Sequence, residues 1–551
     1  MNNFRFLWRS AAVLRILRKV KRIGMADSHT PDRPLSDPPI PREPRAGLSR
    51  RFLLQATAAG IAGAAIGSTL QAGQAKPTPA ATPAATGTPA AARNSAVDVV
   101  VIGAGISGLI AARELERRGF STTTLEAAQR IGGRCLRRKT IQNWWIDLGG
   151  QWIGKTHHLF SDLAQELKLS TFDSHFEGDS VLMLKGQRLV RPMEEDWESS
   201  YLNLDPRKLP ISEHDQKEAL RVHQQFLKLA NTVNPVEPWA TPGAQELDSE
   251  TIESWMRRQT DSDFAQYIYR DYTRIGGSGG YEPNEASILH LALTYKAAPQ
   301  GESPEYKLLD GGAGQMPALL QQQIRGQIQT AAAARLVSRE GDGYRVSAAN
   351  GSEHRCRSVV VALPPALRSR IVFEPGLPHR VNGFCQRAPM GSMIKVMAIY
   401  DSAWWRDEGL SGFAQGQLSA LALTADSSPP SGRPGILAGF VAADKALQIG
   451  QLSAAERRGI ILDDLVTYFG SRAGKPRDYA EFNWGNEAWV TGGFTSFMTP
   501  GAWTSFGPAW REPVGRIVWA GTESSTRWAG YYEGAIQAGL DAAARVRSLL
   551  A

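Results

Sequence analysis

Three glycines near the start of the folding part of the chain have the types and spacing that suit a phosphate group. Gly103, Gly105 and Gly108 follow a β-branched run, Asp98–Ile102, and precede an apolar helical stretch, Leu109–Arg118. In such an arrangement the first glycine makes a tight turn, the second lets a pyrophosphate approach the backbone, and the third lets helix and strand pack closely. The pattern therefore predicts a buried strand, a nucleotide-binding turn and a helix whose first N–H groups face the phosphates.

An acidic residue follows at the distance that a nucleotide fold requires. A second predicted strand, Ser121–Leu125, ends at Glu126, which lies 23 residues after Gly103. A glutamate in this place can accept the hydroxyl groups of a ribose. Strand, turn, helix, strand and acid together predict a dinucleotide-binding fold, but they do not distinguish FAD from NAD.

Two arginines flank paired glycines just beyond this acid, in the segment Arg130–Arg134. Guanidinium groups can hold a pyrophosphate through bidentate contacts, although a glycine turn between solvated arginines explains the segment in isolation. Together with the segment Asp147–Gly154 (DLGGQWIG), it resembles the flavin-containing amine oxidase family, whose best-known members are the monoamine oxidases. The resemblance implies that the nucleotide is FAD.

The resemblance extends over nearly the whole chain from Val97. It also rests on these segments: Leu309–Gly312 with Met316 and Pro317, Ser358–Pro365, Trp519–Glu523 and Trp528–Ala535. It implies an α/β fold, α+β overall, in which a Rossmann-like FAD-binding domain is interleaved with a substrate domain of mixed sheet and helices. The residues that it assigns to the cofactor are Gly103, Gly105, Ser107, Gly108, Glu126, Ala127, Arg134, Gly149, Gly150, Gln151, Trp152, Ala334, Gly521, Thr522, Glu523, Tyr531 and Tyr532.

The closing segment has a helical pattern of its own. Apolar residues recur with a period near 3.6 at Ile536, Leu540, Ala543, Val546 and Leu550. A helix is therefore predicted to begin at or just after Gly530. If its N-terminus points at the flavin pyrimidine ring, its N–H groups and dipole would stabilise negative charge there. A helix packed for stability alone fits the stripe equally well, and only the resemblance favours the flavin.

Lys395 and Tyr531 are the predicted catalytic residues. Lys395 begins an apolar strand-like run, so this lysine either reaches outward from an edge or is buried for a purpose. The resemblance implies that it holds a water near flavin N5 and assists oxygen activation. Tyr531 matches one of two aromatic residues that flank the substrate nitrogen in monoamine oxidases.

The partner of this tyrosine departs from the family pattern. Its position carries Thr495, so another ring such as Trp484 or Phe497 is expected to complete the pair. Phe494 stands where animal monoamine oxidases have the cysteine bonded to the flavin, so FAD is expected to be non-covalent. Ala128 replaces a common arginine, which removes one phosphate or ribose contact.

Other reactive residue types are not arranged for chemistry. There is no Ser/His/Asp or Cys/His arrangement and no histidine cluster that would bind a metal. Cys135 lies beside the cofactor motif and is expected to be structural. His157, His158 and His223 are expected to be solvated.

The motifs divide the chain into blocks, as expected for 551 residues, because single hydrophobic cores stop growing at about 250–300 residues. The FAD-binding domain is predicted to comprise residues 95–171, 308–384 and 487–551, and the substrate domain residues 172–307 and 385–486. Within the substrate domain, residues 213–231 and 246–270 are helical in character, whereas residues 394–400 and 435–442 are predicted strands. A sheet above the flavin would enclose the pocket and exclude water.

Basic charge gathers in the leader. Residues 1–75 hold 12 of the 62 basic and 4 of the 54 acidic residues, which leaves 50 of each, so the excess does not indicate nucleic acid. Residues 1–48 form a basic, Pro-rich extension, whose first 24 residues are either a membrane-surface helix or a start site read too far upstream. Residues 49–75, with Arg50 and Arg51, resemble a twin-arginine signal, and residues 76–94 form a disordered linker.

The sequence therefore predicts a periplasmic or secreted, FAD-dependent amine oxidase that the twin-arginine machinery exports. An amine would pass a hydride to flavin N5, and the imine would be hydrolysed to an aldehyde or ketone. Electrons would pass to O2, giving H2O2, or to a periplasmic carrier. The alternatives are an L-amino acid oxidase, which needs an arginine for the substrate carboxylate, a desaturase or porphyrinogen oxidase, and a non-catalytic FAD-binding module. The amine and the choice between monomer and homodimer stay open.

Overall fold

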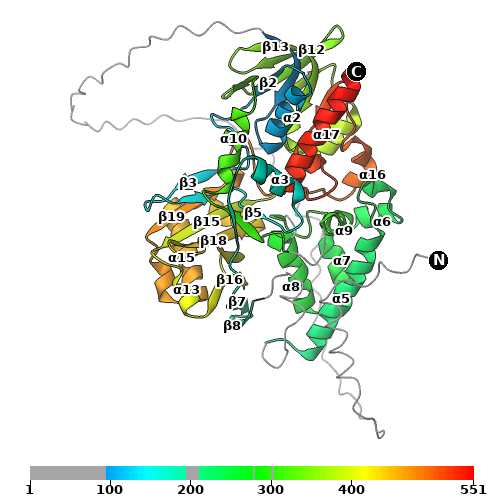
Figure 1. Ribbon diagram of the computed structural model, residues 1–551. Coiled ribbons are helices and arrows are strands. Elements are labelled where there is room, and N and C mark those ends of the chain that lie inside the picture. The colour runs from blue at the N-terminus through cyan, green and yellow to red at the C-terminus, as the bar shows by residue number, and fades with distance from the viewer. Residues whose placement is uncertain (1–94, 194–209, 277–278, 299–302) are drawn as a thin grey trace, which may run out of the picture. The chain divides into compact units, whose positions relative to one another are not determined.

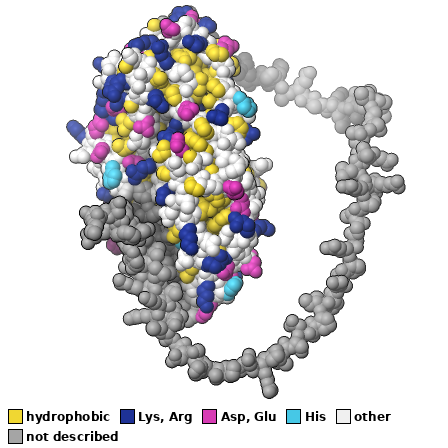
Figure 2. Space-filling model, turned by 90° about the vertical axis from the view of Figure 1, so that its right-hand side faces the viewer, with side chains coloured by type: hydrophobic (Ala, Val, Ile, Leu, Met, Phe, Trp, Pro, Cys, Tyr) yellow, Lys and Arg dark blue, Asp and Glu magenta, His cyan; other side chains and the backbone are white. Residues whose placement is uncertain are grey.

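The computed structural model describes residues 95–193, 210–276, 279–298 and 303–551. The predicted extension, signal and linker all lie outside these residues. No helix in the described ranges is long and apolar enough to cross a membrane. On the face shown in Figure 2, basic and acidic side chains are interspersed, in line with the charge balance of the chain beyond its leader.

An eight-stranded sheet draws its strands from three distant parts of the chain. Its order is β10-β2-β1-β13-β12-β11-β14, and β20 also pairs with β13. The central pairs β10–β2, β2–β1, β1–β13 and β13–β20 are parallel, as in a dinucleotide-binding fold. The valines at positions 99–101 of β1 and 359–361 of β13 are fully buried, which suits strands covered on both faces. The bounds are β1 Ser95–Ile102, β2 Thr122–Leu125, β10 Gln327–Gln329, β11 Ala334–Glu340, β12 Gly343–Ala348, β13 Glu353–Val361, β14 Val372–Glu374 and β20 Ile517–Trp519.

The first and last helices of this sheet pack against each other. The helix α2 (Ile106–Arg117) follows the glycine turn, and α17 (Tyr532–Leu550) closes the chain beside it (Figure 1). Gly539 permits the approach, because an added Cβ would stand 2.5 Å from the carbonyl oxygen of Ser107. The predicted start of the closing helix just after Gly530 is confirmed.

Gly108 permits a similar approach between α2 and the turn before it. An added Cβ would stand 1.9 Å from the Gly103 carbonyl oxygen, so Gly108→Ala is expected to destabilise the protein by about 3 kcal/mol. In Gly459→Ala nothing lies within 4 Å of the new Cβ, and removing a glycine from this exposed position of helix α15 (Ala454–Phe469) should stabilise the protein by about 1 kcal/mol. Urea unfolding of both variants measures the difference, and equal midpoints would contradict this account.

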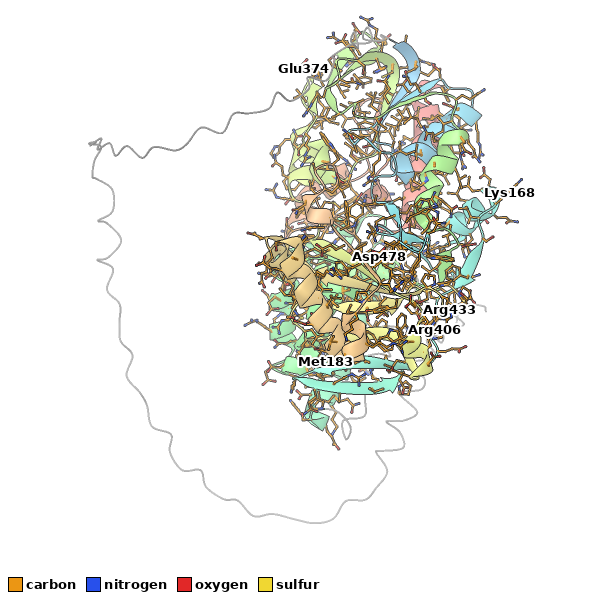
Figure 3. The ribbon with its side chains drawn as sticks, turned by 90° about the vertical axis from the view of Figure 1, so that its left-hand side faces the viewer. Lys168, Met183, Glu374, Arg406, Arg433 and Asp478 are labelled. Carbon is orange, nitrogen blue, oxygen red and sulfur yellow. The ribbon has the colours of Figure 1, made fainter. Side chains whose placement is uncertain are left out.

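A second sheet of seven strands has the order β19-β15-β18-β17-β16-β7-β8. All residues of β15 and β18 are buried, and these two strands confirm the two predicted in this part of the chain. Asp478, at the start of β19, accepts a hydrogen bond from Arg138 at 2.8 Å and so ties this sheet to the segment after the arginine turn (Figure 3). The bounds are β7 Asp179–Leu184, β8 Gln187–Pro192, β15 Met393–Tyr400, β16 Leu410–Gly416, β17 Leu423–Asp426, β18 Gly435–Ala442 and β19 Asp478–Asn483.

Helices accompany this sheet, so the fold is the predicted mixed α/β type. The stretch 246–270 is broken into three helices, because Thr251 and Ser262 each accept a hydrogen bond from a backbone N–H and cap a new helix. The remaining larger helices are α3 His158–Glu166, α5 Glu213–Thr232, α6 Ala244–Ser249, α7 Ile252–Gln259, α8 Asp263–Asp271, α9 Ile288–Ala297, α10 Met316–Gln322, α12 His379–Gln386, α14 Ala443–Gly450 and α16 Ala502–Phe506. The boundaries between the FAD-binding domain and the substrate domain stay a prediction.

Two small sheets accompany the two large sheets. One pairs β3 (Arg137–Lys139) with β4 (Trp145–Asp147), and the other has the order β5-β9-β6, formed by Trp152–Ile153, Lys307–Leu309 and Thr171–Asp173. Asp147, at the end of β4, accepts hydrogen bonds from the N–H groups of Ala313 at 2.7 Å and Gly314 at 2.8 Å. These contacts position the segment that follows Asp147, which forms part of the site.

Candidate active site

The glycine turn forms an open cradle at the start of α2. Gly103 has φ +102°, and an added Cβ would stand 2.8 Å from the Ala362 carbonyl oxygen, so only glycine fits there. At Gly105, by contrast, an added Cβ would have no neighbour within 4 Å. Gly105 is also the N-cap of α2 and offers no side-chain cap, which leaves the first N–H groups of the helix without an intrahelical partner. Open space at the N-terminus of a helix fits the pyrophosphate of a dinucleotide.

Glu126 lies beside this turn, as predicted. Its carboxylate accepts hydrogen bonds from the N–H groups of Ala104 at 2.7 Å and Ala128 at 2.8 Å. Burial raises the pKa of Glu126, although these backbone donors act in the opposite direction. Each oxygen keeps a lone pair that can accept a ribose hydroxyl. The other predicted cofactor residues around this end have these places: Ser107 in the first turn of α2, Ala127 after β2, Ala334 at the start of β11 and Gly521 after β20.

The arginine turn lies against the glycine turn. The N–H of Gly132 donates to the Ala104 carbonyl oxygen at 2.8 Å, and Arg130 donates to the carbonyl oxygens of Gly133 and Cys135. Burial raises the pKa of the Cys135 thiol to about 12, which suits a structural residue.

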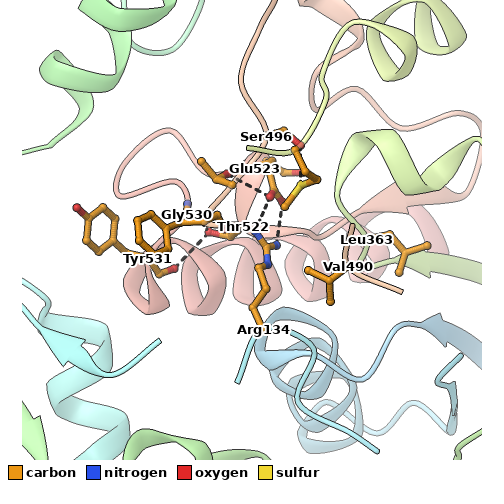
Figure 4. A network of polar contacts seen from close by, with 12 residues as sticks. Arg134, Leu363, Val490, Ser496, Thr522, Glu523, Gly530 and Tyr531 are labelled. Carbon is orange, nitrogen blue, oxygen red and sulfur yellow. Dashed lines mark hydrogen bonds and ion pairs between the residues drawn. The ribbon is translucent and has the colours of Figure 1, made fainter. Parts of the chain in front are cut away.

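The guanidinium of Arg134 has protein partners, and its predicted contact with the pyrophosphate stays a prediction. Its guanidinium donates to Glu523 at 2.7 Å and to the Phe494 carbonyl oxygen at 2.8 Å (Figure 4). Thr495, which occupies the position of the family's second aromatic residue, also donates to Glu523, at 3.1 Å, so its side chain belongs to this network. Burial alone would raise the pKa of Glu523, but Arg134 outweighs burial and the net pKa is lowered.

Arg134→Met is expected to destabilise the protein by about 3 kcal/mol at neutral pH, because it leaves the buried Glu523 carboxylate without its cation. The lowered pKa of Glu523 means that the pair stabilises the fold above the ordinary glutamate pKa and loses this effect as the pH falls through the folded value. The deficit of the variant should therefore shrink in acid. Adding Glu523→Gln should restore most of the loss, and a double variant as unstable as Arg134→Met in urea unfolding would refute the pairing.

Three distant parts of the chain converge on the segment Leu148–Gln151. Lys395 donates to the Gly149 carbonyl oxygen at 2.7 Å and to the side-chain oxygen of Gln151. The hydroxyl of Tyr532 donates to the Gly150 carbonyl oxygen at 2.8 Å.

The same segment also receives Trp484, whose indole N–H donates to the Leu148 carbonyl oxygen at 2.9 Å. Predicted site residues from the arginine turn, the second sheet and the closing helix therefore meet at one place.

Lys395 is buried in the fold and does not extend to solvent. Only 2 % of it is exposed, and its ammonium lies 5.2 Å from the ring centre of Trp152 and 5.6 Å from that of Phe440. Burial lowers the pKa of Lys395 to about 7, while the charge of Asp147 acts in the opposite direction. A lysine that is half protonated near neutral pH can give or take a proton at its Nζ.

Two aromatic rings pack against the ring of Tyr531. His157 lies 5.5 Å from it and Trp528 lies 5.1 Å from it, both edge to face. The Nδ1 of His157 accepts a hydrogen bond from the Gly154 N–H at 2.8 Å, and burial lowers the pKa of His157 to about 4, so the ring is neutral.

The predicted solvation of two histidines was wrong. His157 is fully buried against these rings, and His223 is 6 % exposed. His158 is exposed, as predicted.

Phe494 was missed as a site residue. Its ring meets Phe440 edge to face at 5.7 Å and so lies on the side of Lys395, whereas the next side chain, Thr495, turns to Glu523. Phe497 stacks on Tyr281 at 4.6 Å within the core. No group of residues suited to a metal ion occurs in the described ranges.

Comparisons with known proteins agree on one family. The model of the family described as flavin-containing amine oxidoreductases matches residues 106–547. An L-amino acid dehydrogenase of Synechocystis is 37% identical over 83% of this chain and 96% of its own. The solved structure of wild-type putrescine oxidase bound to putrescine has a TM-score of 0.76 at 29% identity, over 83% of this chain and 100% of its own. Cyclohexylamine oxidase from Brevibacterium oxydans has a TM-score of 0.76 at 31% identity, over 82% of this chain and 99% of its own.

The family match covers most of the described chain and agrees with the geometry of the site. The glycine cradle and Glu126 suit a dinucleotide, and the convergence on Leu148–Gln151 brings the predicted site residues together. The chain belongs to the flavin-containing amine oxidoreductase family and is an oxidoreductase that acts on amines.

Proposed function

We propose that the protein oxidises an amine with non-covalent FAD and passes the electrons to O2 or to an electron carrier. The observation that carries this proposal is the convergence of Lys395, Trp484 and Tyr532 on the carbonyl groups of Leu148–Gln151. The cradle at Gly105 fits the pyrophosphate. When bound, FAD accepts a hydride from the α-carbon of the amine, and the resulting imine is hydrolysed to an aldehyde or ketone.

The side chains of the site have separate tasks in this proposal. Tyr531 supplies a ring that attracts and orients a neutral amine, as its match to the monoamine oxidase motif implies. The packed rings of Trp152 and Phe440 exclude water from the reacting carbon. Lys395 holds a proton at its Nζ beside the site, where it can assist the return of electrons to the acceptor.

The non-covalent state has a direct test. Phe494 cannot form a thioether, and the three cysteines, Cys135, Cys356 and Cys385, are all buried in the fold. Precipitation with acid should therefore release all the yellow colour into the supernatant. Colour that stays in the pellet would refute this part of the proposal.

The second candidate function is the oxidation of L-amino acids, which the Synechocystis relative favours by its name. An amino acid carries a carboxylate beside the reacting amine, and this group needs a cation. The solved structures of putrescine oxidase and cyclohexylamine oxidase favour amines over amino acids by their names.

One anaerobic experiment separates these functions. Pentane-1,5-diamine and L-lysine differ only by the carboxylate, and each is mixed with the holoenzyme while the flavin absorbance is recorded. Bleaching by amines but not by L-lysine is expected. Bleaching by L-lysine alone would establish the second candidate, and a flavin that stays oxidised with a broad panel of amines and amino acids would indicate a non-catalytic module.

Export is a further part of the proposal and rests on the leader sequence. Because the twin-arginine route carries folded proteins, it suits an enzyme that must bind FAD before it leaves the cytoplasm. Replacing Arg50 and Arg51 by lysine in the full chain should retain the protein in the cytoplasmic fraction. Unchanged export of this variant would refute the route.

A further inference from the structure

Arg368 is a buried arginine to which the proposed reaction gives no task. It is the last residue of α11 (Pro365–Arg368), the short helix that follows β13, and only 1 % of it is exposed. Its guanidinium lies 4.6 Å from the ring centre of Trp519. Its hydrogen bonds are long, because Nε donates to the Leu363 carbonyl oxygen at 3.4 Å and Nη2 donates to the Ser524 hydroxyl at 3.3 Å. These contacts fix the guanidinium in place but bring it no negative charge.

Arg368 forms no ion pair with a carboxylate among the described residues. Its Nη1 is buried and has no hydrogen-bond partner in that part of the chain. Burial lowers the pKa of Arg368, while Cys385 and Glu523 act in the opposite direction. Glu523, however, already binds Arg134 through both carboxylate oxygens, at 2.7 Å and 3.3 Å. The side chains of Arg134, Glu523 and Arg368 together therefore carry a net positive charge.

A buried cation without its own counter-charge lowers the stability of a fold. An apolar side chain of similar length fills the same space without this penalty, so replacing a buried ion in this way is often neutral or stabilising. The protein alone therefore gains little from the charge of Arg368. An anion that binds close to this arginine would supply the missing negative charge.

The contacts of Arg368 place it at the edge of the large sheet where the glycine turn lies. Leu363 and Gly521 follow the parallel strands β13 and β20, as Gly103 follows β1, so these three residues lie at the carboxyl ends of adjacent parallel strands. An added Cβ at Gly103 would stand 3.0 Å from the Leu363 side chain, and one at Gly521 would stand 2.7 Å from the Leu363 carbonyl oxygen. Leu363 thus contacts the glycine turn with its side chain and Arg368 with its carbonyl oxygen.

We propose that Arg368 is a positioning residue for FAD, whose buried charge attracts the pyrophosphate and whose contacts hold Leu363 beside the glycine turn. The inference rests on the proposed non-covalent FAD. The negative charge of the bound pyrophosphate offsets the penalty of burying this cation. Arg368 therefore strengthens FAD binding without stabilising the apoprotein, whereas a residue that only packs the core would stabilise both forms.

The test replaces Arg368 by methionine and follows the holoenzyme and the apoprotein separately. The rise in flavin fluorescence after dilution measures the release of FAD from the holoenzyme, and calorimetry measures the melting temperature of the apoprotein. Arg368→Met should release FAD about tenfold faster than the wild type. Its apoprotein should melt at the wild-type temperature or above it.

Two further variants separate the charge from the packing. Arg368→Lys keeps the positive charge and should release FAD within threefold of the wild-type rate. Arg370→Met is the matched control, because Arg370 is an exposed arginine two residues further along the chain, and its variant should release FAD at the wild-type rate.

Each outcome decides the proposal. Equal release of FAD by the wild type and Arg368→Met overturns the role of Arg368 and leaves the proposed function standing. A melting temperature of the Arg368→Met apoprotein clearly below that of the wild type also overturns it, as does Arg368→Lys releasing FAD as fast as Arg368→Met. A wild type that holds no FAD, or holds it covalently, refutes the proposed function and this inference together. If Arg368→Met does not accumulate, the neutral variant Arg368→Gln decides by the same two measurements.

Discussion

Lys395→Met is expected to slow the reoxidation of the enzyme by O2 about a thousandfold while the reduction by amine slows less than tenfold. The substitution keeps the length and apolar packing of the side chain among Trp152 and Phe440 but removes the Nζ that donates to Gly149 and Gln151. Burial lowers the pKa of this lysine to about 7, so near neutral pH it carries an exchangeable proton beside the site. Hydride transfer from a neutral amine needs no such proton.

Stopped-flow absorbance measures the two half-reactions separately. The reduced enzyme is mixed with buffer of known oxygen content, and the oxidised enzyme is mixed with amine under nitrogen. Lys445→Met is the matched control, because Lys445 is a partly buried lysine of the same part of the chain that donates to Leu418 and not to Gly149. Equal losses in both half-reactions for Lys395→Met would contradict the role. A strong effect of Lys445→Met would point to general destabilisation.

The nucleotide-binding part of the site was predictable because its signals are local. A strand, a glycine turn and the first helical turn are contiguous in sequence, so Gly103, Gly105 and Gly108 reveal their positions by spacing alone. Glu126 follows at a fixed distance because one helix and one strand separate it from the turn. The structure places all four where the pattern put them.

The substrate side was less predictable because its contacts are long-range. Thr495 was placed beside Tyr531 on its position in a motif, yet its hydroxyl donates to Glu523 and the neighbouring ring of Phe494 packs against Phe440. His157 was expected in solvent because nothing nearby in sequence shows that Trp528 and Tyr531 will cover it. Pairings between such distant residues are set by the folded topology.

The stretch 246–270 was predicted to be helical, and the structure confirms this with the helices α6, α7 and α8. The breaks between these helices were not predicted, because a helix cap such as Thr251 depends on a single hydrogen bond and not on the average composition of the stretch.

Gly105→Val is expected to abolish FAD binding and leave the fold intact. The backbone at Gly105 is extended, with φ −74° and ψ 177°, and nothing lies within 4 Å of an added Cβ, so the apoprotein accepts a side chain there. The same space must receive the pyrophosphate, whose approach to the N–H groups of α2 the isopropyl group would block. The loss of several charge-assisted hydrogen bonds should weaken FAD affinity by about a thousandfold or more.

The ratio of flavin to protein absorbance after purification measures the bound FAD, and the melting temperature of the apoprotein measures the fold. Gly376→Val is the matched control: Gly376 is exposed just after β14, also has an open Cβ position and lies away from the cradle, so its variant should retain full FAD content. A yellow Gly105→Val protein would show that the pyrophosphate lies elsewhere. A colourless variant with an apoprotein melting temperature far below that of the wild-type apoprotein would mean that Gly105 serves the packing of α2, which its empty surroundings argue against.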